Sequence, residues 1–485
     1  MESVRVTDNA ALHEPWRLAG ARMGFWLRLG LVVAAIFGSV FLAPGAAQGK
    51  PFSLVALALP LGILGLMALA KWPAAGLPLI VVASLLVPLS IGTGRQTGLN
   101  VTLLLVVFFI GLWIFDMVAA RRELRLIESP TFRPLIWLMA VSVLALGFGQ
   151  LDWLPAQRAP ITAQLGGLAL FLLSPGAFLL AAHRFQDLRS LQWAVWLFIG
   201  LGSIFVIGVS LPALRPIALQ VYQRAAIDAM FWTWIVALAF GQAVVNRRLR
   251  LRWRILSGLV VAAAFYFAIM LRGSWTSGWL PALVAVLTIV GLRRPKWLLI
   301  GGAVVGAMLL IPGVASGIFL GGDNQYSLST RFEAWRILLE IIKLNPILGV
   351  GPANYYGYTP LYDILGYWVN FNSHNNYIDI AAQTGLAGLS CFVWFAWAMA
   401  RELWRFLSVV PEGFPRAYVY GAAGGLAGML VAGMLGDWFI PFVYNVGLEG
   451  FRASSLAWLF LGSVVALQQM YPAPSVSPDG EAKSR

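Results

Sequence analysis

The sequence has few of the residues that keep a protein soluble in water or build a metal centre. Only 11% of its 485 residues are charged, whereas soluble domains carry about 25%, so a single water-soluble domain is excluded. The one cysteine, Cys391, rules out a disulfide framework and fits a small buried hydrophobic residue. The three histidines, His13, His183 and His374, lie far apart in the sequence, which argues against a Cys/His metal site.

The sequence is instead rich in apolar residues. Hydrophobic residues make up 60% of the chain, which also has 50 glycines and 21 tryptophans. Glycine is frequent in spanning helices, and tryptophan gathers at the membrane–water boundary. Apolar runs approaching or reaching the about 20 residues of a spanning helix occur about fourteen times. They cover 24–43, 52–70, 77–91, 101–119, 134–150, 162–182, 190–211, 227–245, 255–271, 279–292, 297–316, 377–400, 417–436 and 452–470, of which 77–91 and 279–292 are the shortest. The pattern predicts an all-α polytopic membrane protein.

The basic residues alternate between the connections that join these runs. One set of connections holds ten of the 34 Lys and Arg residues: Lys50, Arg95, Arg158, Arg215, Arg224, Arg272, Arg331, Arg336, Lys343 and Arg452. The other set, which includes the arginine-rich run 246–254, holds the remaining 24 (34 − 10). Cytoplasmic loops carry an excess of Lys and Arg, so the richer set and both termini are predicted to be cytoplasmic. The net charge of +14 is therefore a topology signal, and nucleic acid is not expected as a partner.

One connection stands apart by its length. Residues 317–376 form a loop of about 60 residues, where ordinary connections have about 4–6, and it is predicted to be periplasmic. Within it, Thr330 and Glu333 have the spacing of a capping box. Apolar residues at helical spacing over 331–343 predict an amphipathic helix across the mouth of the bundle. The predicted organisation is spanning helices over 1–316, this loop, further spans over 377–470 and a disordered cytoplasmic tail over 471–485.

The predicted periplasmic side holds the candidates for chemistry. His374 lies in NSHNNYID (372–379), and a histidine with an ordinary pKa near ~6.5 can take a proton from a hydroxyl. A cap or a packed polar residue at a helix start is the alternative. Arg272 lies in LRGSWTSGW (271–279) and Arg224 in YQRAAIDAM (222–230), where snorkelling to lipid headgroups is the alternative. Several arginines on the side with fewer basic residues indicate an anionic ligand, because guanidinium groups match phosphate oxygens.

Motifs for other chemistries are missing. The sequence has no Walker-type GxxxxGK[ST] and no HExxH, and its predicted periplasmic loops have no DxD or ExxE pair. A divalent metal usually recruits carboxylates. We therefore expect arginine rather than Mg²⁺ to handle phosphate charge, and we expect neither a metal nor another cofactor.

Two segments resemble a known family. STRFEAWRILLEIIKLNPILGVGPANY (329–355), followed by SHNNYIDIAAQTGLAGL (373–389), is similar to the signature of the O-antigen ligase and Wzy-type polymerase superfamily. RGSW (272–275) and Arg224 fall where that family has its outer arginines. The resemblance implies a GT-C-like bundle of about 12–14 transmembrane helices with a large helical periplasmic loop. It also implies a multi-pass protein of the bacterial inner membrane.

The resemblance implies an activity as well. It is an inverting, metal-independent glycosyl transfer from undecaprenyl diphosphate to an acceptor hydroxyl on the periplasmic face, with an acceptor glycan or lipid A core as the second substrate. By motif, His374 matches the family's histidine, which activates the acceptor. Arg272 matches one arginine that holds the diphosphate. Arg224 matches the other, with Arg215 as its competitor, and Arg331 is a further candidate.

Three interpretations of the function stay open: a glycan transferase (an O-antigen ligase or a polysaccharide polymerase), a protein O-oligosaccharyltransferase, and a transporter or lipid flippase. An O-antigen ligase and a polysaccharide polymerase differ in their acceptor, and so does a protein O-oligosaccharyltransferase. A transporter or lipid flippase belongs to another class, which predicts ionisable residues near the bilayer midplane and broken helices in corresponding halves. The predicted spans are nearly free of charge at their centres, which favours the transferase.

Overall fold

The structure is a computed structural model of the chain. It describes residues 76–87, 90–91, 98–120, 122, 126–222, 228–272, 275–297, 303, 310 and 323–472. Outside these residues lie Arg224, the predicted spans 24–43 and 52–70, most of 297–316 and nearly all of the predicted tail. The described residues belong to one unit, Ala74–Arg485, which is separate from Met1–Pro73.

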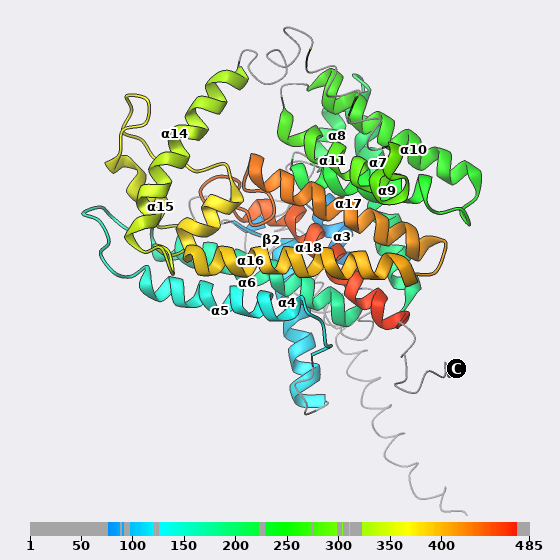
Figure 1. The fold of residues 1–485 in the computed structure, drawn as a ribbon, viewed down its shortest axis with the longest axis horizontal. Coiled ribbons are helices and arrows are strands. Elements are labelled where there is room, and N and C mark those ends of the chain that lie inside the picture. Colours follow the sequence, from blue (N-terminus) through cyan, green and yellow to red (C-terminus); the bar gives the residue numbers. More distant parts are fainter. Residues whose placement is uncertain are drawn as a thin grey trace, which may run out of the picture. The chain divides into compact units, whose positions relative to one another are not determined.

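Helices make up nearly all of the regular structure in the described part (Figure 1). The first group is α3 (Gly76–Leu86), α4 (Val101–Phe115), the π-helical turn η2 (Asp116–Ala120), α5 (Phe132–Phe148), α6 (Ile161–Arg184), α7 (Leu188–Ser210), α8 (Arg215–Tyr222) and α9 (Ala229–Val244). The second group is α10 (Leu251–Phe265), the π-helical turn η4 (Tyr266–Leu271), α11 (Thr276–Arg293), α14 (Asp323–Leu344), α15 (Tyr355–Tyr358) and η5 (Thr359–Leu361). The last group is α16 (Asn376–Val409), α17 (Phe414–Leu435), η6 (Leu448–Gly450) and α18 (Phe451–Met470). The short strands β1 (Ser90–Ile91) and β2 (Leu99–Asn100) pair antiparallel.

The described helices confirm an all-α polytopic membrane protein. Eight helices in this part of the chain are long and apolar enough to cross a membrane: Val101–Ala119, Ile161–Arg184, Leu188–Ser210, Leu251–Leu271, Thr276–Arg293, Asn376–Val409, Phe414–Leu435 and Leu448–Met470. Three shorter apolar helices, α3, α5 and α9, stand where the sequence predicts the spans 77–91, 134–150 and 227–245.

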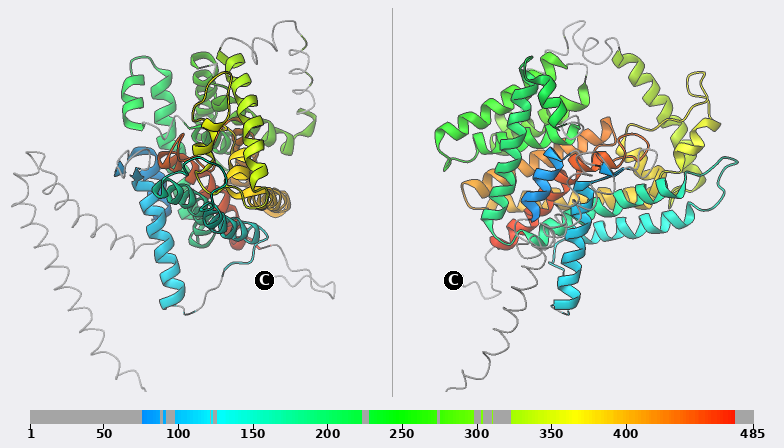
Figure 2. Two further views of the ribbon diagram at one scale, coloured as in Figure 1. Left: turned by 90° about the vertical axis from the view of Figure 1, so that its left-hand side faces the viewer. Right: turned by 180° about the vertical axis from the view of Figure 1, so that it is seen from behind.

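The most buried helices are α9 and α18. The whole apolar window of α18 is buried, and the helix packs against α6, α9 and α17. Helices α5, α6 and α16 run alongside one another (Figure 1, Figure 2). At the start of α18, the buried Arg452 guanidinium donates hydrogen bonds to the Ser84 and Leu85 carbonyls. Ser84 and Leu85 belong to the last turn of α3, so the cation lies at the negative end of that helix dipole.

Helix α16 is broken near its start. Gly385 has φ +69°, ψ −175°, which is not helical, and glycine adopts this region without the steric cost of a Cβ. The break leaves backbone N–H groups without helical partners. Leu386 N–H donates to the Pro346 carbonyl at 2.8 Å and Ala387 N–H to the Ile347 carbonyl at 3.1 Å. The segment after α14 thus completes the backbone hydrogen bonding of α16.

The predicted capping box in the 317–376 loop is wrong. Helix α14 begins at Asp323, so Thr330 and Glu333 lie inside it. The Glu333 carboxylate instead accepts from Arg336 one turn along, at 2.7 Å, and such i,i+3 pairs suit a helix interior. The predicted helix does exist, but it starts eight residues before Arg331 (331 − 323 = 8).

Candidate active site

His374 lies directly ahead of α16, in a backbone conformation that is unusual for its residue type. Its φ is +46°, in the left-handed region where few non-glycine residues occur. The residues on both sides fix this turn. Trp335 of α14 donates its indole N–H to the Ser373 carbonyl at 2.8 Å. Asn375 caps α16, accepting from the Tyr377 and Ile378 N–H groups. The cap is therefore Asn375, and the imidazole of His374 is not used for it.

His374 forms part of the wall of a recess of about 590 Å³, a size typical of ligand pockets. The walls come from α14, α15, the segment 364–374 and the loop between α17 and η6. The lining residues are Thr330, Arg331, Ala334, Tyr356, Ile364, Leu365, Tyr367, Val369, Asn370, Phe371, Asn372, His374, Tyr444 and Asn445. Among the predicted site residues that the structure describes, Arg331 is the one that lines this recess together with His374.

A buried carboxylate stands behind His374. Asp437 is 1% exposed and accepts hydrogen bonds from Asn445 Nδ2 at 2.6 Å and from the Phe442 N–H at 2.9 Å. Asn445 Nδ2 in turn lies 3.5 Å from His374 Nδ1. Because a carboxylate only accepts, it sets the orientation of the Asn445 amide. The amide nitrogen then faces one side of the imidazole and limits its rotation.

The surroundings keep His374 neutral at pH 7. His374 is exposed at the recess, and desolvation by the surrounding protein, together with the nearby Arg331 charge, lowers its pKa to about 4. Burial also lowers the pKa of Arg331, while the Asp437 carboxylate opposes that shift. Desolvation raises the pKa of Asp437 from its ordinary value. The recess is thus lined by one cation and one neutral imidazole, and one buried acid lies behind them.

The predicted phosphate ligands divide between two places. Arg331 extends from α14 and donates from Nη1 to the Leu435 carbonyl at 3.1 Å. Arg215 and Arg272 instead line a smaller pocket of about 120 Å³. Its other lining residues are Phe205, Leu219, Trp232, Phe267, Leu271 and Trp275. The structure therefore brings Arg215 and Arg272 together, and it does not bring either into the lining of the His374 recess.

The comparison with protein families addresses the same part of the chain. The family described as O-Antigen ligase matches residues 221–393. The matched residues, 221–393, are called the ligase domain below. This match confirms the resemblance seen in the sequence and supports a ligase- or polymerase-type glycosyltransferase in general. No curated protein matches the chain.

The ligase domain contains Arg272, Arg331 and His374, but not all of the residues around them. Asp437 and Asn445 lie beyond its C-terminal end, and Arg215 precedes it. Sequence reasoning singled out neither Asp437 nor Asn445. No local sequence pattern predicts these two residues, because Asn445 and His374 are 71 residues apart in the sequence.

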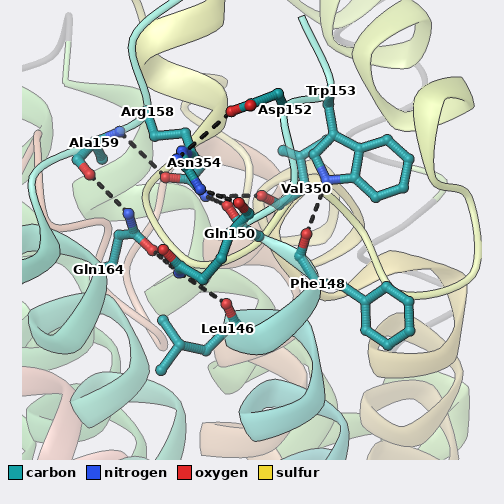
Figure 3. Close-up of polar contacts among 11 residues, drawn as sticks. Leu146, Phe148, Gln150, Asp152, Trp153, Arg158, Ala159, Gln164, Val350 and Asn354 are labelled. Carbon is teal, nitrogen blue, oxygen red and sulfur yellow. Dashed lines mark hydrogen bonds and ion pairs between the residues drawn. The ribbon is translucent and has the colours of Figure 1, made fainter.

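The turn-rich part of the ligase domain is held by buried hydrogen bonds (Figure 3). Asn354 donates from Nδ2 to the Gly149 and Val350 carbonyls and accepts from the Ala159 N–H. On the other side, Ala353 N–H donates to Gln383 Oε1 at 3.0 Å, just before the break in α16. Arg158, which Figure 3 shows beside Asn354, pairs with Asp152 at 3.5 Å. The segment 349–355 is therefore fixed between α16 and the connection from α5 to α6.

The other described histidine has a structural role. His183 accepts the Ile127 N–H at Nε2 and uses Nδ1 with the Leu179 carbonyl. Both ring nitrogens are thereby occupied. Among the described residues, no group of three or more His, Cys, Asp or Glu side chains is arranged to hold a metal ion.

Proposed function

We propose that the protein is an inverting, metal-independent glycosyltransferase that moves a glycan from undecaprenyl diphosphate to an acceptor hydroxyl on the periplasmic face of the inner membrane. The position of His374 supports this most directly. It is a neutral imidazole on the wall of a ligand-sized recess, next to a cation and restrained by Asn445 and Asp437. The O-antigen ligase domain supplies the reaction class.

In the proposed reaction, the acceptor hydroxyl oxygen attacks the anomeric carbon of the donor sugar. A carbon–oxygen bond forms there, and the bond from that carbon to the diphosphate oxygen breaks on the opposite side. The bonding electron pair leaves with the diphosphate, and the hydroxyl proton moves to Nδ1 of His374, the nitrogen with the lone pair when the Asn445 amide nitrogen faces it. A diphosphate is a good leaving group, so the step requires no protein acid.

The arginines have the complementary role. Guanidinium groups stay charged and can bind two phosphate oxygens at once. We assign Arg272 and Arg215 to the diphosphate because they line one pocket together, and Arg331 to the charge that develops beside His374.

The test uses purified full-length protein, a synthetic undecaprenyl-diphosphate glycan and candidate acceptors, with EDTA present throughout. We expect transfer at an undiminished rate in EDTA and a product whose new glycosidic bond has the anomeric configuration opposite to that of the donor. An EDTA-treated enzyme that requires Mg²⁺ or Mn²⁺ for activity would contradict the arginine-based mechanism. A product with the donor's configuration would contradict direct attack by the acceptor.

A further inference from the structure

Half of the residues that line the His374 recess carry an aromatic ring or a side-chain amide. Four aromatic residues line it, Tyr356, Tyr367, Phe371 and Tyr444, together with the amides Asn370, Asn372 and Asn445. The one arginine of the lining, Arg331, already donates to a backbone carbonyl. Arg215 and Arg272 serve the other pocket. This lining is suited to an uncharged polar ligand with apolar faces rather than to a diphosphate.

One aromatic wall is rigid. The Tyr356 and Tyr444 rings stack with centroids 4.4 Å apart and an interplanar angle of 12°. Phe442 packs behind both rings, at 6.1 Å from Tyr356 and 6.0 Å from Tyr444. Phe442 is itself buried and stacks on Tyr355. These rings join α15 to the loop that carries Asp437 and Asn445, so the wall is fixed relative to His374.

A second aromatic surface stands on a tight hairpin. Ile364 and Tyr367 exchange both backbone hydrogen bonds, at 2.9 and 3.0 Å, and the two residues between them have positive φ, +52° at Leu365 and +88° at Gly366. Such a pair is typical of a type I′ turn. Ile364 is buried and anchors the hairpin, whereas Tyr367 is 64% exposed. An exposed tyrosine on an anchored hairpin at a recess wall is available to a ligand.

We propose that this recess binds an uncharged sugar of the acceptor, which stacks on Tyr367 and on the Tyr356–Tyr444 pair. The proposal rests on the proposed function, because it makes the hydroxyl that His374 deprotonates a sugar hydroxyl. The C–H groups on one face of a sugar ring are weakly positive and match the negative face of an aromatic ring. The Asn370 and Asn445 amide nitrogens already donate to the Tyr356 carbonyl and to Asp437, so their Oδ1 atoms can accept from ring hydroxyls. Asn372 Oδ1 is buried without a hydrogen-bond partner and can accept as well. The acceptor is then a glycan rather than a protein serine.

The neighbour of Tyr367 provides a matched control. Trp368 is 65% exposed, almost the same as Tyr367, but it does not line the recess. Replacing either residue by alanine removes one exposed aromatic ring from the same short segment. Damage to the hairpin would therefore appear in both variants, whereas a lost stacking surface would appear only in Tyr367→Ala.

The experiment measures binding without donor, using full-length protein in detergent on an array of uncharged oligosaccharides and on serine- and threonine-containing peptides. The strongest glycan is then titrated against each variant. We expect the Kd to rise about tenfold or more in Tyr367→Ala and to stay within about threefold in Tyr367→Phe and Trp368→Ala.

Three results would overturn the proposal. They are an unchanged Kd in Tyr367→Ala, an equal loss in Trp368→Ala, and retention of peptides instead of glycans. Because binding is measured without transfer, these results leave the proposed reaction untouched. Failure of the transfer assay, conversely, does not alter the binding result.

Discussion

His374 combines an unusual backbone conformation with a restrained side chain. A non-glycine residue at φ +46° stores a modest strain, and such residues concentrate at functional sites. Here the strain is held by Trp335 on one side and by the α16 cap on the other. The imidazole is thereby presented to the recess while the adjacent Asn445 faces its Nδ1. These contacts make Asn445 a positioning residue in the proposed mechanism.

Removal of the Asn445 side chain should therefore lower kcat, because His374 would lose the contact that positions it. We expect Asn445→Ala to reduce kcat by about ten- to a hundredfold, because a catalytic group that is misplaced by an ångström loses that much. In a His374→Ala background the same substitution should cost nothing further, since the group that it positions is gone. Single-turnover rates of the four proteins would show this. Equal fold losses in the two backgrounds would exclude a positioning role.

The titration of His374 gives a separate prediction. Since its pKa is lowered to about 4, the imidazole of the donor-free protein should stay neutral between pH 7.5 and 5.5. The chain has three histidines, so the ring signal of His374 in an NMR spectrum can be assigned from its loss in His374→Gln. A chemical shift that titrates near pH 6.5 would show that neither desolvation nor Arg331 acts on the ring.

The sequence could predict part of this site. His374, Arg272 and Arg331 stand in short motifs, so their types and neighbours indicated a role. Asp437, Asn445 and the grouping of Arg215 with Arg272 depend on how distant segments pack. No spacing along the chain encodes those contacts.

At the scale of the elements, the break in α16 joins the two segments that resemble the ligase family. Gly349 and Gly385 both have positive φ, and the backbone of 346–351 bonds directly to 382–387. The sequence predicted an unbroken apolar run over 377–400. It could not show the break, because glycine is common in spanning helices and needs no break there.

A Cβ at position 385 should be poorly tolerated. Gly385→Ala would require a positive φ from alanine, and its Cβ would meet the Ile347 carbonyl oxygen. We expect the melting temperature in detergent to fall by several degrees, in line with about 2–4 kcal/mol for strain plus collision. Gly258→Ala in α10 is the control, since a Cβ there has nothing within 4 Å and alanine favours a helix. An equal melting temperature for Gly385→Ala and the wild type would mean that the break is not as described.

At the scale of the whole chain, hydropathy predicted the described helices well. Nearly every described span lies within a few residues of an apolar run, because a bilayer imposes length and polarity directly. α16 is the exception, since it continues nine residues beyond its run (409 − 400 = 9). The buried interior of the bundle, such as α9 and α18, was not distinguishable from lipid-facing helices. Both kinds are apolar on all sides, so the pattern carries no information about neighbours.

The predicted orientation can be tested with two exposed positions in a Cys391→Ser background. Asp363 lies in the segment beside the recess, and Ser408 lies at the far end of α16; both are exposed. Asp363→Cys should react with an impermeant maleimide in intact spheroplasts, and Ser408→Cys only after lysis, because basic connections stay cytoplasmic. The reverse pattern would place the recess in the cytoplasm and contradict the proposed localisation.

The most direct test of the account is a comparison of His374→Ala and Arg272→Ala for transfer rate per folded molecule and for donor affinity. We predict that His374→Ala lowers the transfer rate by about 10²–10⁴-fold while donor affinity stays nearly unchanged, because the histidine acts on the acceptor. Arg272→Ala should weaken donor affinity as well as transfer, and Arg272→Lys should restore only part of both, because it keeps the charge but loses the bidentate fork. A transfer rate near that of the wild type in folded His374→Ala would contradict the account.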